Sequence, residues 1–257
     1  MAANWTLITG ASEGLGVEFA RLAAAEGRDL ILVARQAAKM EALAEDLRRR
    51  HKIAVEVWPT DLGDPDAVET LWRKVALRRH IDVLVNNAGL GYNGPFAGDD
   101  FGREMSSVMV NVAALTILMK RGVQHMLKQG GGRILNVAST AAFMPGPNMA
   151  VYHATKTYVL SLSEAAAEEL RGQPVTVTVL CPGATATNFA KDAKMENIAL
   201  FRSFPVASAA RVARKGWKAM KRGRRICVPG LLNKIIALLP RFSPRFLTTN
   251  VTARFMK

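Results

Sequence analysis

Short apolar segments alternate with amphipathic segments along most of the chain. We expect strands at residues 5–9, 30–34, 54–58, 81–85, 133–138, 174–181 and 225–229, and helices at 15–26, 37–50, 65–79, 101–128 and 205–222. Parallel strands need a crossover of a dozen or more residues, which is usually a helix. The alternation therefore predicts one α/β domain over residues 1–230, built on a parallel sheet.

A glycine-rich turn follows the first predicted strand. Gly10, Gly14 and Gly16 stand directly before a helical pattern. Glycine lets the backbone turn tightly and approach a pyrophosphate at the positive end of a helix. Taken alone, the same spacing also fits an ordinary tight turn between a strand and a helix.

The second predicted strand ends without an acidic residue. An acid at this place would bind the adenosine ribose hydroxyls of NAD, but the chain has Ala34 followed by Arg35. We expect Arg35 to meet the 2′-phosphate of NADP. The alternative is a solvated arginine that caps the next helix.

A hydroxyl, a phenol and an ammonium occur within residues 139–156. Ser139 ends a strand, and a Pro- and Gly-rich turn leads to the helix that carries Tyr152 and Lys156. A spacing of four residues places Tyr152 and Lys156 on one helix face, where the ammonium would favour the ionised phenol. An isolated pair of this kind is more often an ordinary surface pair.

These motifs occur together with Asn86-Asn87-Ala88-Gly89, Asn111 and Pro182-Gly183. In order and spacing, up to about residue 230, the set resembles the short-chain dehydrogenase/reductase family. The resemblance implies a Rossmann-type doubly wound parallel sheet of about seven strands with helices on both faces. It also implies an NADP(H)-dependent interconversion of a ketone or aldehyde and an alcohol.

The resemblance implies a role for each matching residue. Tyr152 would exchange a proton with the substrate oxygen, and Ser139 would hydrogen-bond that oxygen. Lys156 would lower the pKa of Tyr152 and hold the nicotinamide ribose, while Asn111 would hold a water in a proton relay. The implied cofactor contacts are Gly10, Ser12, Glu13, Gly14, Leu15, Gly16, Arg35, Asp61, Leu62, Asn87, Ala88, Gly89, Tyr152, Lys156, Pro182, Gly183, Thr185 and Thr187, with Thr187 favoured over Thr185.

Several apolar side chains are candidates for substrate contact. Residues 188–206 are rich in apolar side chains and predict a lid over the site, with a plain buried helical pair as the alternative. We expect a fairly apolar substrate, such as a lipid-like, steroid-like or 3-oxoacyl ketone. The candidate contacts are Ser139, Tyr152, Tyr92, Phe143 and Phe189, and Leu90 and Phe96 are further candidates.

The net charge of +14 comes entirely from the end of the chain. Residues 1–196 hold 21 basic and 21 acidic residues, whereas residues 197–257 hold 14 basic residues and no acid. This asymmetry suggests an acidic partner, which could be a phosphate-bearing ligand, an anionic lipid surface or nucleic acid. We do not favour nucleic acid, because the region lacks the aromatic and basic interleaving of a stacking platform.

Residues 231–257 form an apolar and basic extension that Pro240 and Pro244 interrupt. Three interpretations compete: a cover for the substrate pocket, a subunit contact in a homodimer or homotetramer, and a peripheral anchor on an anionic membrane. We place the cover and the subunit contact before the membrane. The prolines argue against one long helix.

The chain starts close to the first strand, has only Cys181 and Cys227, and shows no apolar run that we expect to span a membrane. We expect a cytoplasmic protein without a metal site, with peripheral membrane contact as an option. A second functional hypothesis is a catalytically idle protein of the same fold that senses a dinucleotide or binds a membrane surface. The complete set of Ser, Tyr, Lys and Asn argues against it, because a sensor does not need a proton relay.

Overall fold

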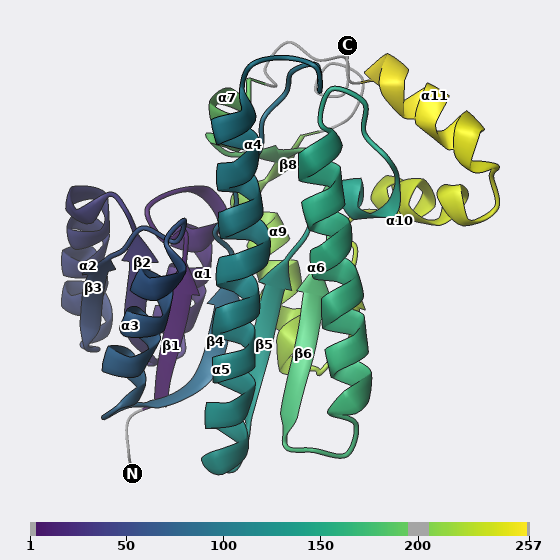
Figure 1. Cartoon of the computed structure of the whole chain (residues 1–257). Coiled ribbons are helices and arrows are strands. Elements are labelled where there is room, and N and C mark those ends of the chain that lie inside the picture. The colour runs from purple at the N-terminus through teal and green to yellow at the C-terminus, as the bar shows by residue number, and fades with distance from the viewer. Residues whose placement is uncertain (1–3, 195–205, 256–257) are drawn as a thin grey trace.

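The computed structural model describes residues 4–194 and 206–255 (Figure 1). Its main sheet is parallel, with strand order β3-β2-β1-β4-β5-β6-β9. The strands are β1 (Asn4–Thr9), β2 (Asp29–Ala34), β3 (Val55–Pro59), β4 (His80–Asn86), β5 (Gly132–Val137), β6 (Val175–Leu180) and β9 (Ile226–Cys227). This architecture confirms the predicted doubly wound sheet of about seven strands. The last strand is shorter than expected, since only two residues pair with β6.

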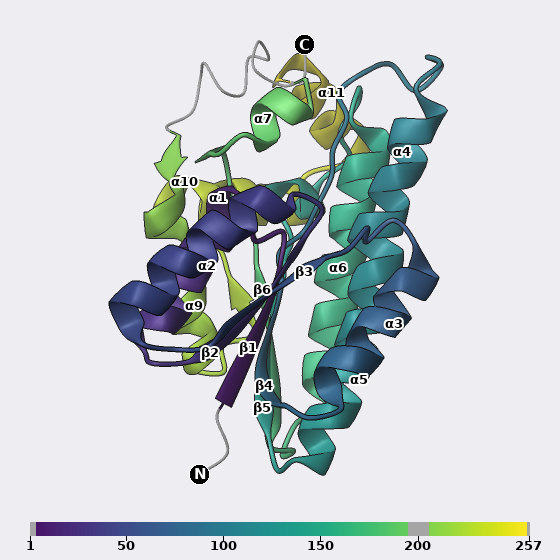
Figure 2. The same ribbon diagram turned by 90° about the vertical axis from the view of Figure 1, so that its left-hand side faces the viewer.

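Helices cover both faces of the sheet (Figure 2). One layer contains α1 (Gly14–Ala25), α2 (Ala37–His51) and α9 (Ala209–Lys221), and the other contains α3 (Pro65–Ala76), α5 (Leu115–Lys128) and α6 (Ala150–Glu169). Alternate strand residues point to opposite faces, so Leu7 packs in one core and Ile8 in the other. The strands are apolar on both faces because both are buried.

The predicted helix at residues 101–128 is one helical run with a π-helical segment inside it. The run consists of α4 (Phe101–Val108), the π-helical η1 (Met109–Ala114) and α5. It is the one run within residues 4–194 and 206–255 that is long and apolar enough to cross a membrane. However, α5 packs against β4 and β5 and buries Leu118 and Met126 in the core of the domain.

The segments above the carboxyl ends of the strands are short. They include the 3-10 helix η2 (Thr140–Phe143), the two-residue strands β7 (Thr185–Ala186) and β8 (Ala207–Ser208), and α7 (Phe189–Asp192). The pairing of β7 with β8 was not expected from the sequence. Ser208 caps α9 through its side chain, so this helix begins at residue 209 rather than at 205. Of the predicted lid, residues 195–205 lie outside the described residues.

The chain ends in α10 (Leu231–Leu238), the 3-10 helix η3 (Leu239–Arg241) and α11 (Arg245–Phe255). Pro240 lies in η3, and Pro244 precedes α11. These helices lie beside the carboxyl end of the sheet, at the end of the molecule where α4 and α6 begin (Figure 1). The extension is therefore placed next to the edge where ligands of open α/β sheets bind.

Candidate active site

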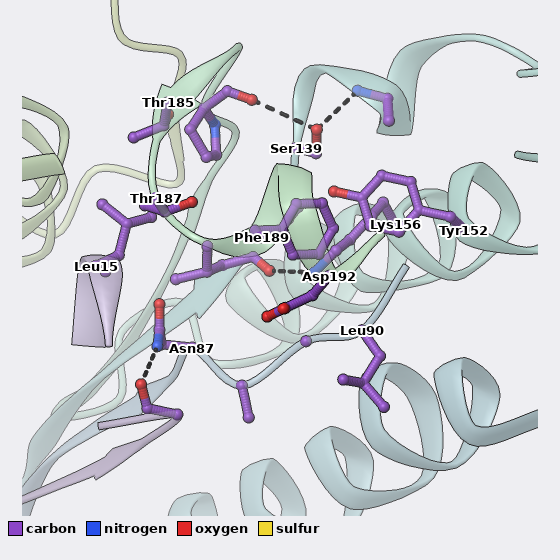
Figure 3. A pocket seen from close by; sticks show the side chains of 18 of the residues that line it. Leu15, Asn87, Leu90, Ser139, Tyr152, Lys156, Thr185, Thr187, Phe189 and Asp192 are labelled. Atoms are coloured by element: carbon purple, nitrogen blue, oxygen red, sulfur yellow. Dashed lines mark hydrogen bonds between the residues drawn. The ribbon is translucent and has the colours of Figure 1, made fainter. Parts of the chain in front are cut away.

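A cavity of about 930 Å³ lies at the carboxyl ends of the strands. Its walls come from the glycine-rich turn, the ends of β2, β4, β5 and β6, and helices α6, α9 and α10. Figure 3 shows part of this wall. The predicted site residues that line it are Gly10, Ser12, Glu13, Gly14, Leu15, Arg35, Asp61, Leu62, Asn87, Ala88, Gly89, Ser139, Tyr152, Lys156, Pro182, Gly183, Thr185, Thr187 and Phe189.

The glycine-rich turn requires glycine at three positions. Gly10 and Gly14 have φ angles of +64° and +55°, which L side chains rarely adopt. A Cβ on Gly16 would lie 2.0 Å from the carbonyl oxygen of Gly10. Gly16 is buried and does not line the cavity, so its role in this turn is close packing.

The turn presents the start of α1 to the cavity. Glu13, at the N-cap position, makes no side-chain capping bond, and the first turn of α1 contains no acid. The free N–H groups of a helix start attract anionic groups. The residues present therefore fit the pyrophosphate of a dinucleotide.

Asn87 fixes the end of β4 to the glycine-rich turn. Its side-chain amide donates to the carbonyl oxygens of Thr9 at 2.9 Å and Gly10 at 3.2 Å, as Figure 3 shows for one such bond. The backbone N–H groups of Asn87 and Ala88 both donate to Thr9 Oγ1 at 3.0 Å. Hydrogen bonds within the protein therefore fix this segment of the cavity wall to the glycine-rich turn.

Arg35 places a positive charge at the end of the cavity near β2. Arg35 is exposed, and no ion pair within residues 4–194 and 206–255 involves it. Glu13 is the acid of the neighbouring turn, and it accepts hydrogen bonds from Lys39 Nζ at 2.6 Å and from Asn188. The hydrogen bond from Lys39, followed by that from Asn188, lowers the pKa of Glu13. The charge of Glu13 is thus already matched, while that of Arg35 is not.

Ser139 and Tyr152 meet in the cavity, from η2 and α6. Ser139 Oγ accepts from the backbone N–H of Ala141 at 3.1 Å and donates to the carbonyl oxygen of Pro182 at 3.4 Å (Figure 3). The Tyr152 phenol is 8% exposed and is hydrogen-bonded to Ser139. Burial raises the pKa of Tyr152 to about 12, and the hydrogen bond to Ser139 opposes this shift.

Lys156 shares the site with Tyr152 but makes no direct bond to its phenol. Its Nζ donates to the carbonyl oxygen of Val137 at 3.0 Å and lies 5.8 Å from the centroid of the Tyr152 ring. Burial lowers the pKa of Lys156 itself to about 8. The spacing of four residues places both side chains at one site, but the ammonium is bonded to the strand end rather than to the phenol.

Asn111 lies behind the cavity wall and not in it. Its Oδ1 accepts from the backbone N–H of Leu90 at 2.8 Å, and its Nδ2 donates to the Leu90 carbonyl at 2.8 Å and to Thr155 Oγ1 at 2.9 Å. A Cβ on Gly89 would lie 3.1 Å from Lys156 Nζ and 3.3 Å from Asn111 Oδ1. The two side chains therefore converge on Gly89 from different helices.

Two of the predicted substrate contacts lie elsewhere. The Tyr92 phenol is hydrogen-bonded to Asp100, and its ring is flanked by Arg103 at 5.6 Å and Lys194 at 5.3 Å. Phe143 packs against the core that α6 covers. Neither residue lines the cavity. The Tyr92 side chain contacts Asp100, Arg103 and Lys194, and the Phe143 ring packs against the core.

Other apolar candidates differ in their placement. Phe96 is 72% exposed and also lies outside the cavity wall. Leu90 lines the cavity, and the ring of Phe189 lies 5.4 Å from that of Tyr152, centroid to centroid.

The cavity also has walls that were not assigned to the site from the sequence. Arg211 and Lys215 on α9 line it, and so do Asn233 and Ile236 on α10. A Cβ on Gly183 would lie 2.4 Å from Asn233 Oδ1, so α10 fits tightly against the end of β6. The spacing of four residues could have predicted that Arg211 and Lys215 lie on the same face of a helix. Nothing in the local sequence fixes where α10 docks.

No group of three or more His, Cys, Asp or Glu side chains is placed to hold a metal ion in the described part of the chain. The glycine-rich turn and the Ser139, Tyr152 and Lys156 set share one cavity. Together with the doubly wound sheet, they define a class of nicotinamide-dinucleotide-dependent oxidoreductases.

The family model for short chain dehydrogenases matches residues 4–197, and the chain belongs to the short-chain dehydrogenase/reductase family. An uncharacterized oxidoreductase of Bacillus subtilis, YvaG, is 33% identical over 70% of this chain and 68% of its own length. A very-long-chain 3-oxoacyl-CoA reductase of Pyrenophora tritici-repentis is 34% identical over 69% of this chain. The match spans 53% of that reductase, about half its length. The human 17-beta-hydroxysteroid dehydrogenase type 3 is 31% identical over 73% of this chain and 61% of its own length.

Solved structures share the fold and contain nicotinamide cofactors. A short-chain dehydrogenase from Sphingobium yanoikuyae in complex with NADPH has a TM-score of 0.82 and 30% identity, covering 89% of this chain and 88% of its own. A family member from Burkholderia phymatum in complex with NAD has a TM-score of 0.81 and 25% identity, covering 93% and 92%. A nicotinamide dinucleotide is therefore the cofactor class.

Proposed function

We propose that this protein is an NADP(H)-dependent carbonyl reductase that interconverts a ketone or aldehyde and an alcohol. The observation that carries the proposal is the buried phenol of Tyr152, hydrogen-bonded to Ser139 in the cavity that the glycine-rich turn also lines. NADPH, when bound, supplies the hydride for carbonyl reduction.

Tyr152 acts as the proton donor in the reducing direction. With its pKa raised to about 12, the phenol keeps its proton at neutral pH and can give it to the carbonyl oxygen as negative charge develops there. Ser139 turns its hydroxyl toward the same oxygen and stabilises that charge. The bond from Ala141 N–H holds the Ser139 oxygen in place for this task.

Lys156 and Asn111 support the proton transfer. The buried ammonium of Lys156 holds the nicotinamide ribose and stabilises the phenolate that Tyr152 becomes after it has given up its proton. Asn111 fixes Leu90 and faces Lys156 across Gly89, the place for a water that returns the proton. The remaining cofactor contacts are the cavity-lining residues of the glycine-rich turn, β4, β6 and Thr187.

Arg35 favours NADP(H) over NAD(H). It follows Ala34 at the end of β2, lines the cavity and has no carboxylate partner in the described part of the chain. A guanidinium pairs well with the 2′-phosphate, and no carboxylate follows β2 to accept ribose hydroxyls.

The substrate is a fairly apolar ketone of lipid-like, steroid-like or 3-oxoacyl type. Support comes from the cavity wall, which includes Met105, Met109, Met144, Met149 and Ile236. Methionine side chains adapt their shape, so such a wall accepts bulky apolar groups.

We place the protein in the cytoplasm as a homodimer or homotetramer. Cys181 and Cys227 are both free, which fits a reducing compartment. Phe101, Leu127 and Tyr158 are exposed on α4, α5 and α6 and offer apolar area for a subunit contact.

A panel of ketones and alcohols with NADPH and NADH, followed by nicotinamide absorbance, tests the proposal. We expect turnover of bulky apolar ketones with NADPH. Tight binding of NADPH without turnover of any carbonyl or alcohol would contradict it and favour a dinucleotide sensor.

A further inference from the structure

Exposed apolar side chains are concentrated at the C-terminal end. Of the 16 large apolar side chains that are exposed in residues 4–194 and 206–255, nine lie between Leu231 and Val251. Leu231, Ile235, Leu238, Phe242, Phe246 and Val251 represent this group, which we call the C-terminal apolar surface. Phe242 and Phe246 are 80% and 71% exposed. A patch of this kind marks an interaction site.

The helix that starts this surface is docked on its other side. Ala237 is buried, Ile236 lines the cavity, and Asn233 fits against Gly183 and donates to the carbonyl oxygen of Pro229. Ile235 and Leu238, three residues apart on one helix face, are exposed and do not line the cavity, whereas the exposed Leu231 borders it. The helix therefore has one face fixed to the catalytic domain and an apolar face that points outward.

Cations accompany the C-terminal apolar surface without any acid. Lys234, Arg241, Arg245 and Arg254 are exposed, and no ion pair of the described residues 4–194 and 206–255 involves them. The sequence contains no Asp or Glu after Glu196. A partner that complements this surface must therefore offer both apolar groups and negative charge.

We infer that the C-terminal apolar surface attaches the protein to the surface of an anionic lipid bilayer. Helices of eight and eleven residues are too short to span the roughly 30 Å hydrocarbon core, so they lie in the interface with their apolar side chains inserted. The neighbouring cations meet anionic headgroups. Figure 1 shows α10 and α11 at the margin of the molecule, beside the layer that contains α6.

A second copy of the chain fits this surface less well. In a two-fold symmetric contact the same patch meets itself, so the cations Lys234, Arg241, Arg245 and Arg254 of one copy would meet the cations of the other. Like charges without acids between them oppose such an interface. A lipid surface supplies both the apolar layer and the negative charge.

The test is sedimentation of the full chain with vesicles of phosphatidylcholine alone or mixed with phosphatidylserine. We expect binding to the mixed vesicles that weakens as salt is raised. Phe242→Ser with Phe246→Ser should lower the partition coefficient at least ~10-fold. Arg241→Glu with Arg245→Glu should remove the preference for phosphatidylserine. The matched control is Leu77→Ser with Arg78→Glu, just before β4 at the amino-terminal end of the strands, where Leu77 is 76% exposed. This control variant should bind vesicles like wild type.

Two outcomes would overturn the inference. One is wild-type protein that stays in solution with phosphatidylserine vesicles. The other is a pair of Ser substitutions that turns a dimer into a monomer, seen by sedimentation velocity, with vesicle binding unchanged. NADPH affinity and the thermal midpoint verify that each variant is folded. Because vesicle binding needs no substrate, its failure is separate from failure of the proposed reductase activity.

Discussion

Lys156 Nζ lies 5.8 Å from the centroid of the Tyr152 ring and donates its hydrogen bond to the carbonyl oxygen of Val137, at 3.0 Å. The two side chains thus share a site without a direct bond. Each pKa is set mainly by burial, which favours the neutral form of both groups. The phenol is therefore a proton donor at neutral pH, and the ammonium is costly to bury.

The cost of burying Lys156 predicts a pH-dependent stability. The unfolded chain keeps this proton up to its ordinary pKa of 10.5, whereas the folded chain releases it near pH 8. Between these values the unfolded state binds more protons, so the free energy of unfolding rises with pH, by at most about 3 kcal/mol. Buried Cys181, whose pKa is raised to about 12, contributes the opposite slope in both proteins. In denaturant unfolding, the change in the free energy of unfolding from pH 8 to pH 10.5 should therefore be more positive in wild type than in Lys156→Met.

Lys74 on α3 provides the control for that measurement. It is exposed, and Lys74→Met should keep the wild-type dependence. An equal gain in Lys156→Met would show that the buried ammonium carries no such penalty.

Arg35→Asp should shift the cofactor preference from NADPH toward NADH. The substitution removes the phosphate partner and adds an acceptor for ribose hydroxyls, while its charge repels the 2′-phosphate. The ratio of kcat/KM for the two cofactors should change at least ~10-fold. Arg78→Asp, an exposed cation before β4, should leave the ratio unchanged. A wild-type preference for NADH would refute the role of Arg35.

Gly14→Ala should weaken NADPH binding at least ~10-fold, because the backbone must shift at the turn that presents the start of α1. A Cβ at this position would lie 2.9 Å from Thr187 Cγ2, and φ is +55°. Gly27→Ala is a matched control, since its φ is +70° and no atom lies within 4 Å of its Cβ. Both variants should lose about 1–2 kcal/mol of stability from the left-handed backbone, but only Gly14→Ala should lose cofactor affinity. Equal NADPH affinities in the two variants would contradict a role for this turn in binding.

Ile236→Trp should raise the KM for bulky ketones more than for small ones. Ile236 lines the cavity from α10, and the larger indole ring of Trp would fill part of the cavity beside this position. The neighbouring Ile235 is 47% exposed on the outer face, so Ile235→Trp should leave both KM values unchanged. If Ile236→Trp also left them unchanged, α10 would not contact the substrate.

The sheet, the order of its elements and the meeting of the glycine-rich turn, Ser139, Tyr152 and Lys156 at one cavity could be predicted from the sequence. Strand and helix periodicities are local, and Gly10, Gly14 and Ser139 follow strands whose carboxyl ends meet at one edge of a parallel sheet. The motif around Tyr152 and Lys156 placed both residues at the cavity because one helix turn joins them.

The parts that could not be predicted depend on contacts between distant segments. Asn111 bonds to Leu90, 21 residues earlier in the chain, from within a π-helical segment, and the spacing of residues along the chain does not indicate this contact. Phe143 turns into the core because η2 packs on α6, and α10 reaches the cavity because Asn233 fits on Gly183. The pKa of Tyr152 depends on burial, which residue spacing does not contain.

The most direct test of the reductase proposal is NADPH consumption by Tyr152→Phe with the best ketone of the wild-type enzyme. The substitution keeps the ring and removes the proton donor, so kcat should fall at least ~10²-fold while NADPH affinity is retained. Tyr158→Phe, on the same helix but exposed and hydrogen-bonded to Thr116, should keep wild-type activity. Most of the activity remaining in Tyr152→Phe would contradict the assignment of Tyr152 as the proton donor.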